Sequence, residues 1–152
     1  NRIYACHFDG FTIGDSVKFN LNEESVFGIN NFQTYEIFAE RVANSKKKLV
    51  KLLKDLKSDG KKIMSIGATA KSTTVFNSLI DVITDTTIDK QGKCSPGMHI
   101  PIVAREDVNI LDYDYVYLGA WNFKDVIATK EKEFVENGGK FITHVPDVMV
   151  FS

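Results

Sequence analysis

The sequence predicts an α/β fold: a Rossmann-like open parallel sheet with helices on both faces, preceded by a long helix and an N-terminal β-hairpin. Three observations support this class. Short apolar runs alternate with helical segments after residue 60, which is typical of strand-helix-strand units in a parallel sheet. One long apolar stripe with helical spacing precedes them. Near the start, apolar runs flank the turn pairs Asp9-Gly10 and Gly14-Asp15.

The first thirty residues differ in pattern from the rest of the chain. Residues 3–8 and 16–21 are rich in apolar side chains, and the turn residues between them favour an antiparallel hairpin. We therefore expect an N-terminal β segment over residues 1–31. A Rossmann-like C-terminal domain with its lead-in helix is expected over residues 32–152.

The lead-in helix is expected over residues 32–57. Its apolar positions recur at steps of three and four and include Tyr35, Phe38 and Leu53. Eight lysines crowd residues 46–62, and they fall mostly off the apolar stripe. A solvated helix face explains them better than a phosphate-binding patch, because lysines also suit the negative C-terminal end of a helix dipole.

The remaining elements are expected to alternate in type. Short apolar runs predict strands at residues 62–66, 82–84, 99–103, 115–118 and 141–143, with an edge strand at 148–151. Apolar spacing predicts helices at residues 72–79 and 123–136. The pair Gly138-Gly139 is expected to end the last helix.

The composition excludes several classes of partner. The 152 residues include 19 basic and 20 acidic side chains, for a net charge of −1, so we expect no nucleic-acid partner and no membrane partner. The chain has two cysteines, too few for a disulfide framework, which favours a reducing compartment and a cytoplasmic location. It begins with Asn rather than Met, so we expect a processed chain or a piece of a longer protein.

The turn after the first expected strand is the first candidate binding site. In an open parallel sheet, ligands bind outside the carboxyl ends of the strands. Residues 67–73 read GATAKST: the small residues allow close backbone approach, a helix N-terminus supplies N–H groups, and Lys71 supplies charge. The turn lacks the glycines of a P-loop and of a dinucleotide fingerprint. Helix capping by Ser72 or Thr73 beside a solvated lysine is the alternative.

Three further segments are candidates for the same sheet edge. Asp85 ends the second expected strand, near the place where an acidic residue can hold a ribose hydroxyl, although turn chemistry explains it equally well. The loop at residues 90–102 contains two glycines and two prolines and carries polar side chains. Trp121 and Asn122 follow the expected strand at 115–118; packing of Trp121 and helix capping by Asn122 are the alternatives.

Metal and nucleophile chemistry have no clear motif. Cys6 and His7 are adjacent, and Cys94 lies five residues before His99, which is no recognised zinc spacing. No G-x-S-x-G nucleophile motif occurs. We therefore expect no metal site and no catalytic residue in this chain.

Four segments together resemble a known family. They are GATAKSTT at 67–74, DTTIDKQGKCSPGMHIPI at 85–102, AWNF at 120–123 and GGKFI at 138–142. In order and spacing they resemble the C-terminal domain of S-adenosylmethionine-dependent sugar C-methyltransferases. The resemblance implies a longer enzyme, in which a zinc domain and a methyl-donor domain precede this one and hold zinc, S-adenosylmethionine and the catalytic base.

The resemblance also implies a role for this chain. It would bind a nucleotide-diphosphate ketosugar and position it against the methyltransferase domain of the same protein, with no cofactor and no turnover of its own. The candidate substrate-binding residues are Gly67, Ala68, Thr69, Lys71, Ser72, Thr73, Asp85, Lys90, Gln91, Gly97, His99, Trp121 and Asn122. The alternative is a free-standing Rossmann-like module that binds a nucleotide or a protein without catalysis. An NAD-linked oxidoreductase is disfavoured because the fingerprint glycines are missing.

Overall fold

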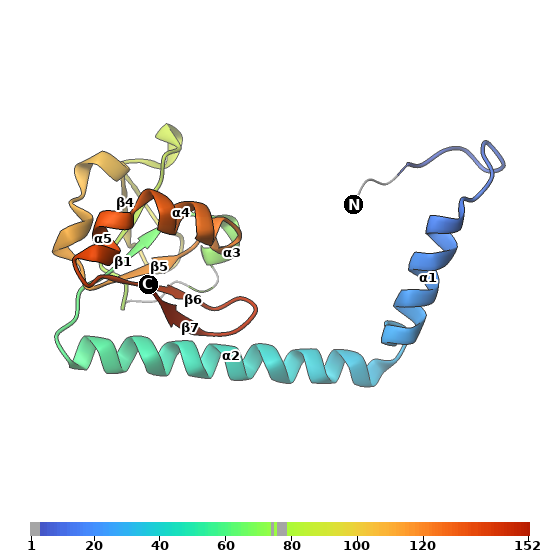
Figure 1. Cartoon of the computed structure of the whole chain (residues 1–152), viewed down its shortest axis with the longest axis horizontal. Helices are drawn as coiled ribbons and strands as arrows, with labels where there is room; N and C mark the ends of the chain where they lie inside the picture. Colours follow the sequence, from blue (N-terminus) through green and yellow to red (C-terminus); the bar gives the residue numbers. More distant parts are fainter. Residues whose placement is uncertain (1–3, 74, 76–78) are drawn as a thin grey trace. The chain divides into compact units, whose positions relative to one another are not determined.

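A computed structural model describes residues 4–73, 75 and 79–152 of the chain. The chain divides into two compact units, residues 1–42 and residues 43–152, and the boundary falls inside a long helix (Figure 1). No helix among the described residues is both long enough and apolar enough to cross a membrane.

The first unit is helical. Its helices are α1 (Asp15–Phe27) and the beginning of α2 (Phe32–Ser58). The expected N-terminal hairpin is therefore wrong, since residues 16–21 lie within α1 rather than in a strand. The residues Val17, Phe19 and Leu21 alternate with polar residues as in a strand, but the signals at both ends of α1 favour a helix. Asp15 lies in its first turn, where a carboxylate suits the helix dipole.

Gly28 supplies the stop signal for α1. Its φ of +83° lies in the left-handed region that glycine adopts without strain. The Gly28 N–H donates to the Ser25 carbonyl at 3.0 Å, and the Ile29 N–H donates to the Glu24 carbonyl at 3.2 Å. These two bonds form a Schellman motif, which closes the helix end.

The second unit is built on a seven-stranded sheet with the order β3-β4-β2-β1-β5-β6-β7. The parallel strands are β1 (Ile63–Ile66), β2 (Val82–Thr84), β4 (Pro101–Val103), β5 (Tyr115–Leu118) and β6 (Lys140–Thr143). Two antiparallel strands form the edges: β3 (Lys93–Cys94) and β7 (Met149–Phe151). The strand order reverses between β1 and β5, which is the topological switch point of a doubly wound sheet.

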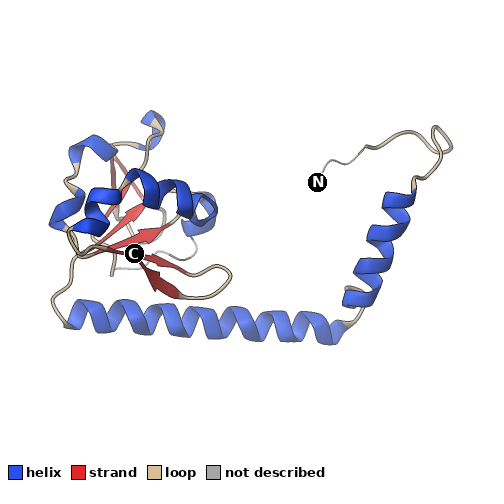
Figure 2. Cartoon of the chain, viewed as in Figure 1, coloured by secondary structure: helices blue, strands red, loops and turns tan. Residues whose placement is uncertain are grey.

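Both faces of the sheet are covered, as the sequence predicts (Figure 2). On one face, Leu49 and Leu53 from the second half of α2 belong to the same buried cluster as Ile83 and Tyr117. On the other face, the cluster includes Phe134 of α5 (Lys132–Glu136). Successive strand residues alternate between the two clusters, because side chains on a strand point alternately to opposite faces.

Two helical predictions need adjustment. The expected helix at 72–79 is described only as α3 (Ala70–Thr73), and residues 74 and 76–78 lie outside the described residues. The expected helix at 123–136 is divided into α4 (Lys124–Lys130) and α5. The break falls at Glu131, whose carboxylate accepts hydrogen bonds from the Arg105 guanidinium at 3.1 and 2.6 Å. Short 3₁₀ turns complete the unit at Ile88–Lys90, Arg105–Asp107, Ile110–Asp112 and Trp121–Phe123.

Candidate functional site

The turns after β1 and β5 lie against each other at the switch point. Gly67 follows β1 with a φ of +95°, which a side chain would strain. A Cβ at Gly119, which follows β5, would collide with the Gly67 carbonyl oxygen. The Thr69 hydroxyl also donates to the Gly119 carbonyl at 3.2 Å. The two loops that flank the usual ligand crevice are thus held in contact by glycine backbone and one side-chain hydrogen bond.

Thr69 and Ser72 cap α3 reciprocally. The Thr69 hydroxyl accepts from the Ser72 N–H at 3.1 Å, and the Ser72 hydroxyl accepts from the Thr69 N–H at 3.0 Å, as in a capping box. The expected cap at Ser72 or Thr73 is therefore wrong, because Thr69 occupies the capping position. The Thr73 N–H donates to the Thr69 carbonyl at 3.1 Å, so the N–H groups of Thr69, Ser72 and Thr73 all donate hydrogen bonds within the turn.

Asp85 joins the turn after β1 to the loop after β2. Its Oδ2 accepts from the Ala68 N–H at 2.8 Å and from the Lys90 ammonium at 3.0 Å, and its Oδ1 accepts from the Thr87 N–H at 2.8 Å. Burial alone would raise the pKa of this carboxyl, but the hydrogen bonds outweigh it and hold the pKa below its ordinary value. Gln91 donates to the Asp85 carbonyl at 3.0 Å, so the sheet edge gathers these candidates as expected.

Lys71 and Trp121 meet across the switch point. The Lys71 ammonium lies 5.6 Å from the centre of the Trp121 ring, within the range of a cation–π contact. Trp121 is half-buried and Asn122 is exposed. The 3₁₀ turn Trp121–Phe123 leads into α4. The N-cap residue of α4 is Phe123, and no side chain makes a capping hydrogen bond there. The alternative that Asn122 caps this helix is therefore wrong.

Gly97 and His99 lie elsewhere. They belong to the turn of a hairpin in which β3 runs antiparallel to β4, and this turn precedes Pro101 at the amino end of β4. The expectation that the whole loop reaches the carboxyl edge of the sheet is wrong for these two residues. The physical reason is the two-residue strand β3, which pairs with β4 and reverses the chain direction; only Lys90 and Gln91, which come before β3, stay at the carboxyl edge.

Buried Tyr117 and half-buried His144 form a pair at the same edge that no sequence motif predicts. The Tyr117 hydroxyl of β5 hydrogen-bonds to Nδ1 of His144, which directly follows β6, at 2.8 Å, and the two rings stack with centres 5.7 Å apart. Burial lowers the pKa of His144 and raises the pKa of Tyr117, so the neutral forms are favoured. A lone histidine gives no signal in the sequence, and only the alignment of β5 with β6 indicates its position.

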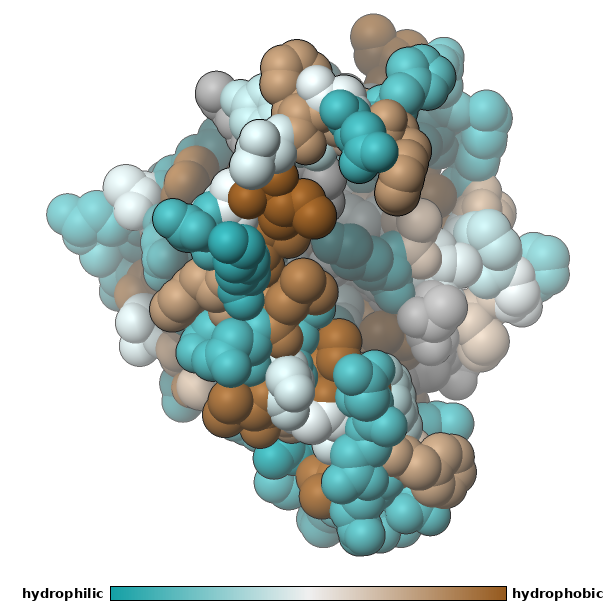
Figure 3. Space-filling model, turned by 90° about the vertical axis from the view of Figure 1, so that its right-hand side faces the viewer, coloured by the Kyte–Doolittle hydropathy of each residue, from teal (hydrophilic) through white to brown (hydrophobic). Residues whose placement is uncertain are grey.

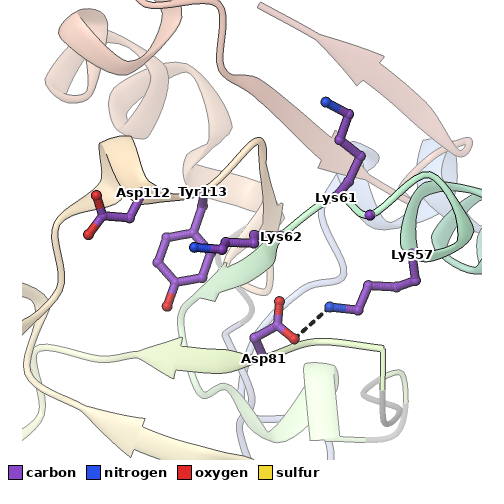
Figure 4. Close-up of a pocket in the computed structure, with 7 residues that line it drawn as sticks. Lys57, Lys61, Lys62, Asp81, Asp112 and Tyr113 are labelled. Atoms are coloured by element: carbon purple, nitrogen blue, oxygen red, sulfur yellow. Dashed lines mark hydrogen bonds and ion pairs between the residues drawn. The ribbon is translucent and has the colours of Figure 1, made fainter.

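A cavity of about 470 Å³ opens at the opposite, amino end of the sheet (Figure 4). Three lysines and two aspartates are among its lining residues, and the Lys57 ammonium pairs with the Asp81 carboxylate at 2.6 Å. The other Asp81 oxygen accepts from the Ile63 N–H at 2.9 Å. These contacts join α2, the loop before β2 and the start of β1, so the acidic side chain has a structural role there.

Zinc does not fit the described residues. Among residues 4–73, 75 and 79–152, no group of three His, Cys, Asp or Glu side chains could hold a metal ion. Cys6 and Cys94 are both exposed and unbridged. The candidate site of this chain is therefore described by the turns after β1 and β5, where the Lys71 ammonium lies beside the Trp121 ring.

Comparison with known proteins identifies the family of this chain. Residues 2–146 match the family described as the C-methyltransferase C-terminal domain. The chain is also 37% identical over 138 residues to C-methyltransferase NovU of Streptomyces niveus, an alignment that covers 87% of this chain and 33% of NovU. The chain thus spans about a third of the length of this relative. It belongs to the C-methyltransferase C-terminal domain family.

Proposed function

We propose that this chain is the substrate-holding part of an S-adenosylmethionine-dependent sugar C-methyltransferase, and that it binds a nucleotide-diphosphate ketosugar at the switch point between β1 and β5. The observation that carries the proposal is the approach of Lys71 to Trp121 across that point, 5.6 Å from ammonium to ring centre. Open α/β sheets bind ligands at this position. A cation beside an aromatic ring suits a ligand that combines phosphate charge with a flat base.

The proposed contacts follow from the chemistry of each group. Lys71 supplies the positive charge for the diphosphate. Trp121, half-buried at the start of its turn, offers a ring face on which a base or sugar can stack. Asn122 is exposed beside it and can hydrogen-bond a sugar hydroxyl through its amide. Lys90, whose ammonium also donates to the Ala68 carbonyl at 2.9 Å, adds a second positive charge at the edge.

The other sequence candidates have a supporting role in this proposal. Gly67 and Ala68 allow close backbone approach, while the hydroxyls of Thr69 and Ser72 hold the turn in shape through their reciprocal bonds. Asp85 and Gln91 orient the second loop. Gly97 and His99 are left out, because their turn lies at the other end of β4.

The reaction itself is assigned to the rest of the polypeptide. A base there would remove the proton next to the sugar ketone, and the carbon made nucleophilic in this way would accept the methyl group. When bound, S-adenosylmethionine supplies that methyl group. The residues of this chain contribute by holding the ketosugar so that the reacting carbon stays in position.

Hydrogen-exchange mass spectrometry of the full-length protein tests the proposal. Thymidine diphosphate and uridine diphosphate are added separately, and exchange is compared in peptides that contain residues 67–73 and 119–123. We expect protection of both peptides by at least one probe, with no change in peptides from the hairpin turn at residues 95–100. Saturable binding that protects neither turn would contradict the proposal.

A further inference from the structure

The described part of the first unit has only exposed and half-buried side chains. None of the described residues from 4 to 42 falls in the buried class, although this stretch is rich in large apolar residues. The exposed apolar side chains include Phe8, Phe11, Phe19, Phe27, Phe32 and Phe38. Figure 3 shows apolar residues, in brown, at the surface of one face of the molecule among hydrophilic ones. Exposed apolar surface on this scale is typical of an interaction site.

Part of this surface continues a stripe that is buried elsewhere on the same helix. With 3.6 residues per turn, Tyr35, Phe38 and Val42 follow the same line along α2 as Leu49 and Leu53. In the second unit this line lies against the sheet, where Leu49 and Leu53 are only 3% and 1% exposed. At the other end, Phe38 is 63% exposed and Val42 is 52% exposed. One amphipathic face thus changes from covered to uncovered along the length of the helix.

We propose that the uncovered stripe, defined as Phe32, Tyr35, Phe38 and Val42, docks against the methyltransferase domain of the same polypeptide. This inference rests on the proposed function. The family is a C-terminal domain, and the relative NovU is about three times as long as the matched segment. In such a protein the remaining polypeptide precedes residue 1, so α1 and the first half of α2 are the helices of this chain nearest to it in sequence. The methyltransferase domain is therefore the occupant for which the uncovered stripe is best placed in sequence.

Charge disfavours a second copy of this chain as the occupant. Residues 1–45 contain three basic and six acidic side chains, so this segment has a net negative charge. A symmetric pair brings the same surface of two copies together and would place like charges face to face, which costs binding free energy. A domain of different sequence is free of this restriction.

Site-specific photo-crosslinking tests the proposal in the full-length protein. The photoreactive residue p-benzoylphenylalanine replaces Phe38, and the matched control replaces its neighbour Ile37, which is also exposed but points away from the stripe. We expect a cross-link from position 38 to the methyltransferase domain, on a product that keeps the mass of one chain. The cross-link is expected to be lost at position 37.

Each other outcome overturns the inference. A product with the mass of two chains would assign the uncovered stripe to self-association. A cross-link from position 38 into residues 43–152 would mean that the second unit of this chain covers the uncovered stripe. The absence of any cross-link would mean that the stripe stays exposed to solvent in the full-length protein. C-methylation is measured on the same preparations. An active enzyme whose cross-link lies elsewhere would refute this docking surface but not the proposed function. A full-length protein without a methyltransferase domain would refute the proposed function itself.

A second pair of variants guards against local disturbance by the large photoreactive group. Phe38→Glu places a charge in the uncovered stripe, and Ile37→Glu places the same charge one position away. We expect faster hydrogen exchange in methyltransferase-domain peptides for Phe38→Glu only. Equal exchange in those peptides for both variants would contradict the docking surface.

Discussion

The Asp85 carboxylate, at the end of β2, accepts a hydrogen bond at 2.8 Å from the backbone N–H of Ala68, which lies in the turn after β1. Two more donors, the Thr87 N–H and the Lys90 ammonium, complete its coordination. One side chain therefore holds two neighbouring loops in a common arrangement. The arrangement matters because both loops border the proposed ligand crevice.

Replacing Asp85 should destabilise the fold. In Asp85→Ala, three donors lose their acceptor, and hydrogen bonds to a charged group are each worth roughly 1.5 to 3 kcal/mol. Since the Lys90 ammonium reaches solvent and can be rehydrated, we expect a net loss of about 2 kcal/mol in the free energy of unfolding. Urea unfolding measures it, with Asp89→Ala in the same loop as the exposed control. Equal midpoints for the two variants would refute the role of Asp85.

Lys71→Ala should weaken ligand binding without unfolding the domain. The exposed ammonium lies beside Trp121 at the proposed diphosphate position, and loss of a charge-assisted hydrogen bond costs roughly 1 to 3 kcal/mol of binding free energy. Calorimetric titration of the full-length protein with a nucleotide-diphosphate sugar measures the change. Lys93→Ala, at an exposed lysine on the edge strand β3, is the matched control and should bind as the wild type does. An unchanged affinity in Lys71→Ala, with a wild-type circular dichroism spectrum, would show that Lys71 has no role in ligand binding.

Much of the sheet could be predicted because its strands are buried runs. Ile63, Met64 and Val116 are fully buried, and continuous apolar runs between turn residues are typical of strands covered on both faces. The approach of Asp85 to the turn after β1 was also predictable, since neighbouring parallel strands end at one edge.

The wrong predictions have physical causes as well. Alternating Val17, Phe19 and Leu21 fit both a strand and an exposed helix, and periodicity alone does not separate these cases in short segments. The residues at the ends of α1, such as Gly28, favour a helix over a strand. His99 was misplaced because a two-residue strand has too little sequence signal to reveal a hairpin. The partnership of His144 depends on the register of β5 with β6, which no local pattern encodes.

Gly119→Ala should disturb the contact between the two turns of the site. A Cβ there would collide with the backbone carbonyl of Gly67, and backbone atoms cannot turn aside as a flexible side chain does. Overpacking of this kind costs about 1 to 3 kcal/mol, and the shifted turn should also weaken ligand binding. Gly60→Ala is the matched control. The φ of Gly60 is +72°, so a side chain there is strained, but no atom would collide with its Cβ. We therefore expect Gly60→Ala to lower the free energy of unfolding and to leave the ligand affinity unchanged. Wild-type affinity in Gly119→Ala would show that the turns can separate without loss of the site.

The stability of the domain should fall as the pH is lowered from 7 to 5. Burial beside Tyr117 lowers the pKa of His144 below its ordinary 6.5. As the pH falls through 6.5, the unfolded chain therefore binds a proton at this imidazole that the folded chain does not, so the free energy of unfolding decreases until the folded group is protonated too. Asp85 and Asp114 have pKa values below the ordinary 3.8, so their stabilisation is lost at more acidic pH, outside this window.

Urea unfolding at pH 7 and pH 5 separates the contribution of His144. We expect His144→Gln to reduce the difference between the two free energies of unfolding, because the glutamine amide does not titrate in this range. The same measurement on His99→Gln, at an exposed imidazole in the hairpin turn before β4, shows whether the change is particular to position 144. If His144→Gln keeps the full difference, the imidazole beside Tyr117 is not the group that links folding to protonation in this range.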